Sequence, residues 1–327
     1  MIRPLEVTLT QLEAFVMVAR LGSVTAAAKA LGVSEPAVSG ALAALRQQLG
    51  DPLIARTPAG MTLSPGGQRF VPIASQIVGL AAEGHSAIRQ AQGAPARIRV
   101  AASSTVAEFV APPLMAAFSA RYPNIETSVG LSESAEMPAL LHDRLADVCF
   151  GPHLKGEAAA GLVSEPMMRY GLIVVASPEH PLAGVSGVRW QALAAEDWLV
   201  DPSGMDPSSE IGMLMTHLHV PAERVQVFPN QAAAWSAAEQ GLGVAPAIAH
   251  LASPHIERAV LCRLDVVSTP VQLLWYASAL PAERRTPAVA ALMRFLTTPE
   301  AMQSMHRSDG RVPASRFRPP VYVTLWS

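Results

Sequence analysis

The sequence predicts an α/β protein with a small helical head, a long connecting helix and a larger domain of strands and helices. Three observations support this fold class. Residues 22–50 contain two helical patterns joined by a glycine turn, residues 64–92 repeat apolar side chains at helical spacing, and from residue 97 strands alternate with helices, as in parallel α/β layers. A chain of 327 residues, 50% of them hydrophobic, is long enough for two or three domains.

Charge and hydropathy argue against a strongly basic protein and against a membrane-spanning or secreted one. The net charge is −2, so a nucleic-acid footprint has to be local. The longest apolar runs, such as residues 172–176, are strand-sized, and the N-terminus lacks the apolar run of a signal peptide. We therefore expect a cytoplasmic protein without a membrane-spanning segment. Cys149 and Cys262 lie far apart in apolar surroundings, which favours two buried structural thiols over a thiol switch.

Residues 22–50 contain the most specific pattern in the sequence, two short helices joined by a tight turn. The apolar face of the first helix consists of Val24, Ala27, Ala28 and Leu31. Gly32 follows where a helix end needs a left-handed residue, and Ser34 and Pro36 suit the N-cap and the first turn of the next helix. The apolar stripe of that helix consists of Val38, Leu42, Leu45 and Leu49. This pattern predicts a helix-turn-helix, whose second helix enters the DNA major groove.

The flanking segments extend this head. Residues 8–20 predict a preceding helix, and residues 52–63 predict a small β-ribbon. Residues 64–92 predict a long helix capped by Ser64, and its apolar repeat suits a partner helix. Glycine and proline in residues 93–96 break the pattern and mark a hinge.

Residues 9–56 closely resemble the DNA-binding domain of LysR-type transcriptional regulators. The matching pieces are Leu12 and Phe15, then GSVTAAAKALGVSEPAVS and LRQQLGDPLIART, in the same order and spacing. Residues 97–296 resemble, more loosely, the effector-binding domain of that family through ARYPNIET, EPMMRYGLIVV, SPEHPLA and AAEQGLGVAPA. In the family, that domain is a two-lobed α/β fold like that of periplasmic binding proteins.

The resemblance implies a division of the chain into five segments. They are a winged helix-turn-helix DNA-binding domain (1–63), a linker and dimerisation helix (64–92), a hinge (93–96), an effector-binding domain (97–300, with a second lobe at about 162–268) and a C-terminal extension (301–327). In the extension, apolar residues alternate with polar and aromatic ones over residues 321–325. That pattern predicts an edge strand or a segment that touches a neighbouring subunit.

The head supplies the expected DNA contacts. By their place in the motif these are Thr25, Ser34, Glu35, Pro36, Ser39, Arg46 and Arg56. Arg56 is the expected phosphate contact, because a guanidinium binds the backbone in a forked way. The chain departs from the family at Glu35 and Gly40, where a glutamine and a basic residue are usual. Since glutamate accepts from cytosine and repels phosphates, we expect an unusual operator and weak binding per subunit.

Polar side chains follow four predicted strands of the larger domain. They are Ser103, Ser104, Thr105, Ser132, Ser134, Ser203, Asn230 and Gln231. Ligands of two-lobed α/β folds bind beyond the carboxyl ends of strands and at helix N-termini. Hydroxyls, amides and free N–H groups there suit a small anion, most simply a carboxylate. Ser104 and Thr105 stand where the family most often contacts its ligands, although each of these residues could instead be a plain helix cap.

The expected function is that of a LysR-type regulator without enzymatic activity, cofactor or metal. It would bind an interrupted palindrome in double-stranded DNA as a dimer or tetramer, and a small effector in the interlobe cleft would alter DNA binding or bending and the access of RNA polymerase. The sequence has no G-x-S-x-G, CxxC or HExxH motif, and His217 and His219 would point apart on a helix. Two alternatives stay open: a ligand-independent DNA-architectural regulator with a vestigial cleft, and a solute-binding or enzymatic module.

Overall fold

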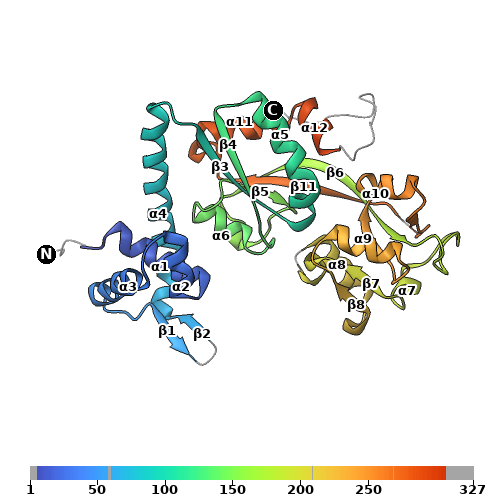
Figure 1. Ribbon diagram of the computed structural model, residues 1–327, viewed down its shortest axis with the longest axis horizontal. Helices are drawn as coiled ribbons and strands as arrows, with labels where there is room; N and C mark the ends of the chain where they lie inside the picture. Colours follow the sequence, from blue (N-terminus) through green and yellow to red (C-terminus); the bar gives the residue numbers. More distant parts are fainter. Residues whose placement is uncertain (1–5, 58–59, 208, 268, 307–327) are drawn as a thin grey trace. The chain divides into compact units, whose positions relative to one another are not determined.

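The computed structural model describes residues 6–57, 60–207, 209–267 and 269–306 (Figure 1). The chain divides into two compact units between Ala94 and Pro95, and residues 142–145 group with the first unit. The first unit consists of helices and one hairpin. The second unit is an α/β domain with two lobes.

The first unit is a winged helix-turn-helix followed by a long helix. Its elements are α1 (Leu9–Leu21), α2 (Val24–Leu31), α3 (Glu35–Leu49), the antiparallel strands β1 (Ile54–Thr57) and β2 (Gly60–Leu63), and α4 (Pro65–Ala91). The predicted apolar faces of α2 and α3 pack in one core with Phe15 of α1. Gly32 ends α2 with a φ of 67°, and the Ser34 hydroxyl accepts a hydrogen bond from the Ala37 N–H at 3.4 Å, so both predicted caps are confirmed.

Asp51 holds the root of the hairpin to the start of α4. Its carboxylate accepts hydrogen bonds from the Ser64 hydroxyl at 2.5 Å and from the Leu53 N–H at 2.6 Å, and these bonds lower the pKa of Asp51. Ser64 also caps α4 by accepting from the Gly67 N–H at 2.9 Å. A side chain at Gly67 would collide with the backbone, because its Cβ would lie 2.0 Å from the Leu53 carbonyl oxygen.

Helix α4 buries one part of its apolar surface and exposes another. Near its start, Phe70 stacks on Phe15 with ring centroids 5.6 Å apart. Farther along, large apolar side chains stay exposed on one face, at 55% for Ile73, 43% for Ile77, 52% for Leu80 and 62% for Ile88. We call these four residues the α4 stripe.

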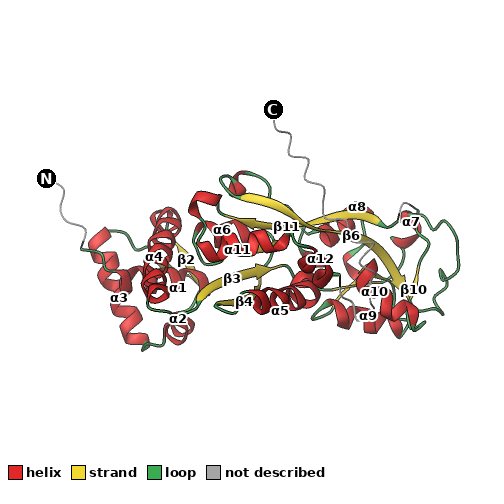
Figure 2. Ribbon diagram, turned by 90° about the horizontal axis from the view of Figure 1, so that it is seen from above, coloured by secondary structure: helices red, strands yellow, loops and turns green. Residues whose placement is uncertain are grey.

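The second unit is built on a mixed seven-stranded sheet (Figure 2). Its first lobe contains the parallel strands β3 (Ala96–Ala102), β4 (Ile125–Leu131) and β5 (Val148–Gly151). The helices of this lobe are α5 (Ala111–Arg121), α6 (Met137–His142), α11 (Pro287–Leu296) and α12 (Pro299–Met305). A short π-helical segment, η1 (Val106–Val110), leads into α5.

Two long strands, β6 (Val163–Ala176) and β11 (Val271–Ala279), connect the lobes. They pair antiparallel with each other, and β11 also pairs antiparallel with β5. The expectation of parallel layers holds for β3, β4 and β5 but is wrong for these connections. One strand carries the chain into the second lobe and the other carries it back, so neighbours in the same sheet must run in opposite directions.

The second lobe surrounds the far end of β6. Its other elements are α7 (Trp190–Leu193), β7 (Trp198–Val200), α8 (Glu210–Leu218), β8 (Val225–Val227), α9 (Gln231–Glu239), β9 (Ala245–Ile248), α10 (Ala249–Glu257) and β10 (Cys262–Arg263). Strands β9 and β10 pair antiparallel with β6, whereas β7 and β8 form a separate parallel pair. Short 3₁₀ turns are η2 (Glu157–Ala159), η3 (Pro202–Met205), η4 (Ala222–Arg224) and η5 (Ala282–Arg284).

The packed domain extends past residue 300, where we expected it to end. Thr298 caps α12, and Ala301, Met302 and Met305 are buried in the core of the domain. Residues 301–305 therefore belong to the domain rather than to an extension. The strand expected at residues 321–325 lies outside the described residues.

The structure also tests the predicted burial of the two cysteines and the predicted lack of a membrane-spanning helix. Cys149 is buried, as predicted, and burial raises its pKa to about 12. Cys262 is only partly buried, so the prediction of full burial is wrong for this residue; desolvation also raises its pKa. None of the helices in the described ranges is long and apolar enough to cross a membrane.

Candidate functional site

The exposed face of α3 is the candidate DNA surface. Ser34, Glu35, Pro36 and Ser39 are all exposed there, and Thr25 is exposed on α2. Val38, Leu42 and Leu45 face the opposite way, into the core. Because the buried stripe fixes how the helix is turned, the side chains predicted to contact DNA point away from the head.

Gly40 leaves a gap in the middle of this face. Apart from the helix's own backbone, no heavy atom lies within 4 Å of the position that a Cβ would take at Gly40. Its backbone is helical, so another residue would not be strained there. A larger side chain at this position would therefore project from the exposed face of α3 without a clash.

The two arginines expected to contact DNA have different surroundings. Arg46 is half-buried, and its Nη2 donates to the Ile54 carbonyl oxygen at 3.0 Å, which ties α3 to the wing strand β1. The guanidinium is thus partly used within the head. Arg56 lies in β1 opposite Met61, and its side chain is outside the described part of the structure.

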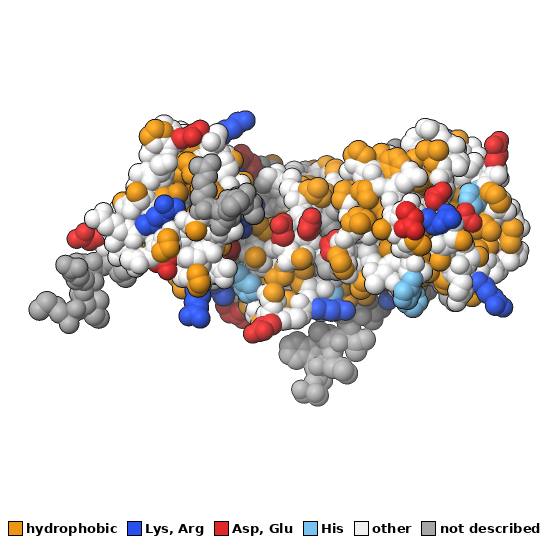
Figure 3. Space-filling view, turned by 90° about the horizontal axis from the view of Figure 1, so that it is seen from below, with side chains coloured by type: hydrophobic (Ala, Val, Ile, Leu, Met, Phe, Trp, Pro, Cys, Tyr) orange, Lys and Arg blue, Asp and Glu red, His pale blue; other side chains and the backbone are white. Residues whose placement is uncertain are grey.

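Charged side chains are sparse on the surface. They make up 15% of the residues in the sequence. On the face drawn in Figure 3, the blue and red side chains of the described residues are scattered between large apolar and uncharged areas, without a continuous basic stretch. With a net charge of −2 and so few charged residues, we expect the contacts to DNA to come from a local set of residues.

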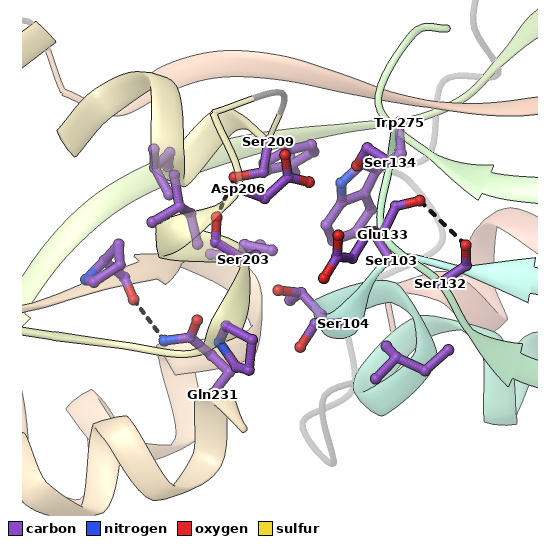
Figure 4. Close-up of a pocket in the computed structure, with 18 of the residues that line it drawn as sticks. Ser103, Ser104, Ser132, Glu133, Ser134, Ser203, Asp206, Ser209, Gln231 and Trp275 are labelled. Atoms are coloured by element: carbon purple, nitrogen blue, oxygen red, sulfur yellow. Dashed lines mark hydrogen bonds between the residues drawn. The ribbon is translucent and has the colours of Figure 1, made fainter. Parts of the chain in front are cut away.

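A cavity of about 130 Å³ lies between the two lobes of the second unit. Seven of the eight residues predicted for an effector line it: Ser103, Ser104, Thr105, Ser132, Ser134, Ser203 and Gln231. Figure 4 shows Ser103, Ser104 and Ser134 of the first lobe on one side of this space and Ser203 and Gln231 of the second lobe on the other. Asn230 is not among the lining residues. Its side chain caps α9 by accepting from the Ala233 N–H at 2.9 Å, so the plain-cap alternative holds for this residue.

Several lining residues escaped the sequence interpretation. They are Leu131, Tyr170, Leu172, Asp206, Ser209, Ile211, Pro246, Ala247, Ile248 and Trp275. Glu133 and Pro202 also line the cavity, next to the predicted Ser132, Ser134 and Ser203. Tyr170 and Trp275 lie on the connecting strands β6 and β11 and stack with centroids 4.2 Å apart. In the sequence they are indistinguishable from ordinary core strand residues. The turn-forming run around Asp206 was the one available signal, because polar residues follow η3 there.

Asp201 connects the lobes behind the cavity. This carboxylate is 0% exposed, and it accepts hydrogen bonds from the hydroxyls of Ser104 in the first lobe and Ser203 in the second, the latter at 2.5 Å. A buried carboxylate needs such donors, because desolvation without them is costly. The two serines are therefore part of a bridge between the lobes as well as part of the cavity wall.

Glu108 makes a second bridge between the lobes. From η1, its carboxylate accepts from the backbone N–H of Gln231 at 3.1 Å and of Ala232 at 3.3 Å, at the start of α9. Burial raises the pKa of Glu108, against the lowering effect of these bonds, and Asp201 adds a smaller rise. The N-terminus of α9, which we expected to attract an anionic effector, is thus occupied by an anion of the protein itself.

The charged side chains of the lining are acidic. Glu133 and Asp206 line the cavity, and the lining contains no lysine, arginine or histidine. In Figure 4 both carboxylates point toward the space between the lobes. This differs from the expectation of an anion site, which rested on hydroxyls, amides and helix ends and gave no weight to the charge of a carboxylate in the lining. Among the described residues, no cluster of three or more His, Cys, Asp or Glu side chains could hold a metal ion.

A winged helix-turn-helix joined to a two-lobed domain with a cavity between its lobes defines a DNA-binding transcriptional regulator with a ligand-binding domain. The LysR substrate binding domain family matches residues 91–299, and the bacterial regulatory helix-turn-helix protein, lysR family, matches residues 9–68. The chain belongs to the LysR family of transcriptional regulators, which is a family of regulators and not of enzymes.

Relatives share nearly the full length of the chain. An uncharacterized HTH-type transcriptional regulator of Mycobacterium tuberculosis, Rv0377, is 33% identical over 98% of this chain and 100% of its own. The HTH-type transcriptional regulator CfxR of Cupriavidus necator is 28% identical over 94% of this chain and 97% of its own. The crystal structure of full-length CbnR complexed with its target DNA matches 88% of this chain and 98% of its own, with a TM-score of 0.59 and 22% identity.

Proposed function

We propose that this regulator binds an interrupted palindrome in DNA and that a small effector in the interlobe cavity changes its DNA binding or bending, and thereby the access of RNA polymerase. The observation that carries the proposal is the bridge through Asp201. Ser104 and Ser203, which line the cavity, donate to this carboxylate from opposite lobes. An occupant that contacts these serines would bind the open and closed lobes with different affinity, which is what coupling to a second site requires.

A homo-oligomer is part of this proposal. The α4 stripe exposes four large apolar side chains along one face of a helix. Such a face is stabilised by a second apolar helix, and a second copy of α4 offers the same stripe. Paired heads would then reach successive half-sites of a palindrome.

The DNA contacts that we propose are Thr25, Ser34, Glu35, Pro36, Ser39, Arg46 and Arg56. The exposure of the first five supports direct contact. For Arg46 we propose a phosphate contact through the part of the guanidinium that Ile54 does not engage. An anionic effector would meet Glu133 and Asp206 with no basic partner in the lining, so we do not propose a carboxylate as the effector.

A footprint on the DNA upstream of the gene tests the proposal, with and without a panel of small compounds that includes amines, alcohols and carboxylates. Protection that shortens or shifts with one compound supports an effector-controlled regulator. Protection that no compound changes would favour the ligand-independent architectural alternative. The absence of protection at moderate salt would contradict the proposed DNA contacts.

A further inference from the structure

We propose that the interlobe cavity binds an organic cation, a primary ammonium group carried on a short apolar body. This inference rests on the proposed function in one respect, that the cavity holds the effector. It goes further by naming the effector's charge and its hydrogen-bonding character. Four features of the lining favour such a ligand: the direction of its hydroxyl groups, its carboxylates, the occupied helix end nearby and its apolar walls.

Four of the six serine hydroxyls in the lining donate their protons to acceptors of the protein. Ser104 and Ser203 donate to the Asp201 carboxylate, and a carboxylate only accepts. Ser132 donates to the Glu133 carbonyl oxygen at 3.1 Å, and Ser209 donates to the Ser203 carbonyl oxygen at 2.5 Å. Each of these hydroxyls has one proton, so only lone pairs are left for a ligand, and Ser209 already uses one of its lone pairs to accept from the Gly212 N–H at 2.8 Å. Ser103, Thr105 and Ser134 also line the cavity, and a hydroxyl can either donate or accept, so these three favour neither kind of ligand.

The carboxylates also favour a ligand that donates hydrogen bonds, and their charge favours a positively charged one. Glu133 and Asp206 line the cavity from opposite lobes, and buried Asp201 adds negative charge behind Ser104 and Ser203. None of the salt bridges among the described residues neutralises Glu133. A carboxylate ligand would bring a further negative charge close to these three carboxylates, whereas an ammonium offers a positive charge, three donors and no acceptor.

The N-terminus of α9 could have favoured an anionic ligand, but its N–H groups already bind side chains of the protein. The first N–H groups of α9 are bound by Glu108 and by the Asn230 side chain. The positive end of the α9 helix dipole therefore faces a carboxylate of the protein and not the cavity. Glu108 thus adds negative charge near the cavity and removes the donors that an anionic ligand would need.

The rest of the wall is apolar and matches a small hydrocarbon body. Leu172, Ile211 and Ile248 line it together with the stacked rings of Tyr170 and Trp275. At about 130 Å³ the cavity is close in size to engineered cavities of roughly 150 Å³ that bind benzene. Aromatic rings beside carboxylates also favour a cation, because the face of a ring attracts positive charge.

The test compares ligands that share a skeleton and differ in charge, by calorimetric titration of the full chain. One set is 2-phenylethylamine, 2-phenylethanol and 3-phenylpropanoate, and the other is n-pentylamine, pentan-1-ol and hexanoate. We expect the amine of at least one set to bind more tightly than its alcohol by roughly tenfold, and the carboxylate to bind most weakly. The proposal would be overturned if a carboxylate bound more tightly than its amine, or if an alcohol bound as tightly as its amine. It would also be overturned if neither amine bound at roughly 10 mM, which corresponds to a binding free energy weaker than about −3 kcal/mol.

Variants assign the preference to the two carboxylates. Glu133→Gln and Asp206→Asn keep the side-chain size and remove the charge, so each is expected to weaken amine binding by roughly tenfold and to leave alcohol binding unchanged. Glu136→Gln is the matched control, because Glu136 is exposed nearby and does not line the cavity. Equal amine affinity in wild type and in both variants would contradict the assignment.

The footprint separates this inference from the proposed function. An amine that binds the cavity and leaves the footprint unchanged would support the ligand class and contradict the effector role. A carboxylate that shifts the footprint would support the effector role and overturn the ligand class. An amine that does both supports the two together.

Discussion

The carboxylate of Glu108 accepts a hydrogen bond of 3.1 Å from the backbone N–H of Gln231, which begins helix α9. One residue is in the first lobe and the other in the second, 123 positions later in the chain. The bond gives an acceptor to a backbone N–H in the first turn of α9, which has no partner within the helix. It also places a negative charge at the positive end of the helix dipole. It therefore holds the two lobes together near the cavity without any ligand.

Removing the Glu108 side chain should destabilise the effector-binding domain. Glu108→Ala leaves the N–H groups of Gln231 and Ala232 without their acceptor, and we expect the free energy of unfolding to fall by about 1–3 kcal/mol. Glu108→Gln keeps one carbonyl acceptor and avoids burying a charge, so it should stay within about 1 kcal/mol of wild type. Urea unfolding of the three proteins measures the difference. An alanine variant as stable as wild type would show that the contact does not hold the lobes.

A basic side chain at Gly40 should strengthen DNA binding. Gly40 is exposed and has open space around its Cβ position, so Gly40→Arg can reach a phosphate or a base edge without disturbing the head. We expect affinity to rise by about 1–3 kcal/mol in free energy and the salt slope to steepen by about one. Fluorescence anisotropy with promoter DNA at several salt concentrations measures both.

Gly40→Gln is the control for this experiment, because it adds a similar side chain without charge. Both variants should make α3 more stable, since glycine is a poor helix former by about 1 kcal/mol. A glutamine variant that binds DNA as tightly as the arginine variant would attribute the gain to the helix and not to the charge.

A charge in the α4 stripe should prevent self-association. Ile77 is 43% exposed on this face, and Ile77→Glu would place a carboxylate in an apolar interface between two helices. We expect a monomer by sedimentation and loss of tight binding to the palindrome. Ala82→Glu is the control, because Ala82 is exposed and lies roughly 140° away around the helix. If both variants remain oligomeric, the stripe is not the interface.

Acid should destabilise the domain through His250. Burial lowers the pKa of His250 to about 4, with a smaller contribution from the charge of His306, whose ring centroid lies 5.2 Å away. The folded state thus binds fewer protons than the unfolded state, whose histidine titrates near 6.5. Stability from this group is present above pH 6.5 and falls as the pH drops toward about 4.

His250→Gln should flatten the decline of the melting temperature over this pH range. The matched control is His217→Gln, because His217 is exposed and should leave the slope unchanged. Melting curves at several pH values between 7 and 4.5, about the window set by the two pKa values, provide the comparison. An identical slope in wild type and His250→Gln would contradict the assignment.

Local patterns predicted much of this protein. The spacing of Val38, Leu42 and Leu45 determined which face of α3 is buried, and Gly32 and Ser34 determined where the two helices end and begin. These features involve residues a few positions apart, so helical geometry alone relates them. The polar residues after β3, β4 and β7 were found in the same way, because strand ends that share a sheet edge meet.

Other features depend on partners that only the fold brings together. The sequence suggested Asn230 as a ligand contact, Arg46 as a DNA contact and an anion as the effector. The tertiary structure made Asn230 a cap, engaged Arg46 with Ile54, and placed Glu133 and Asp206 in the lining.

The sequence by itself determined the family's architecture and seven of the residues that line the cavity. Whether Ser104 offers a proton or a lone pair to a ligand was decided only by tertiary structure, through Asp201, 97 residues away. The physical reason is that a hydroxyl has a single proton, and the acceptor nearest in space receives it, wherever that acceptor lies in the sequence.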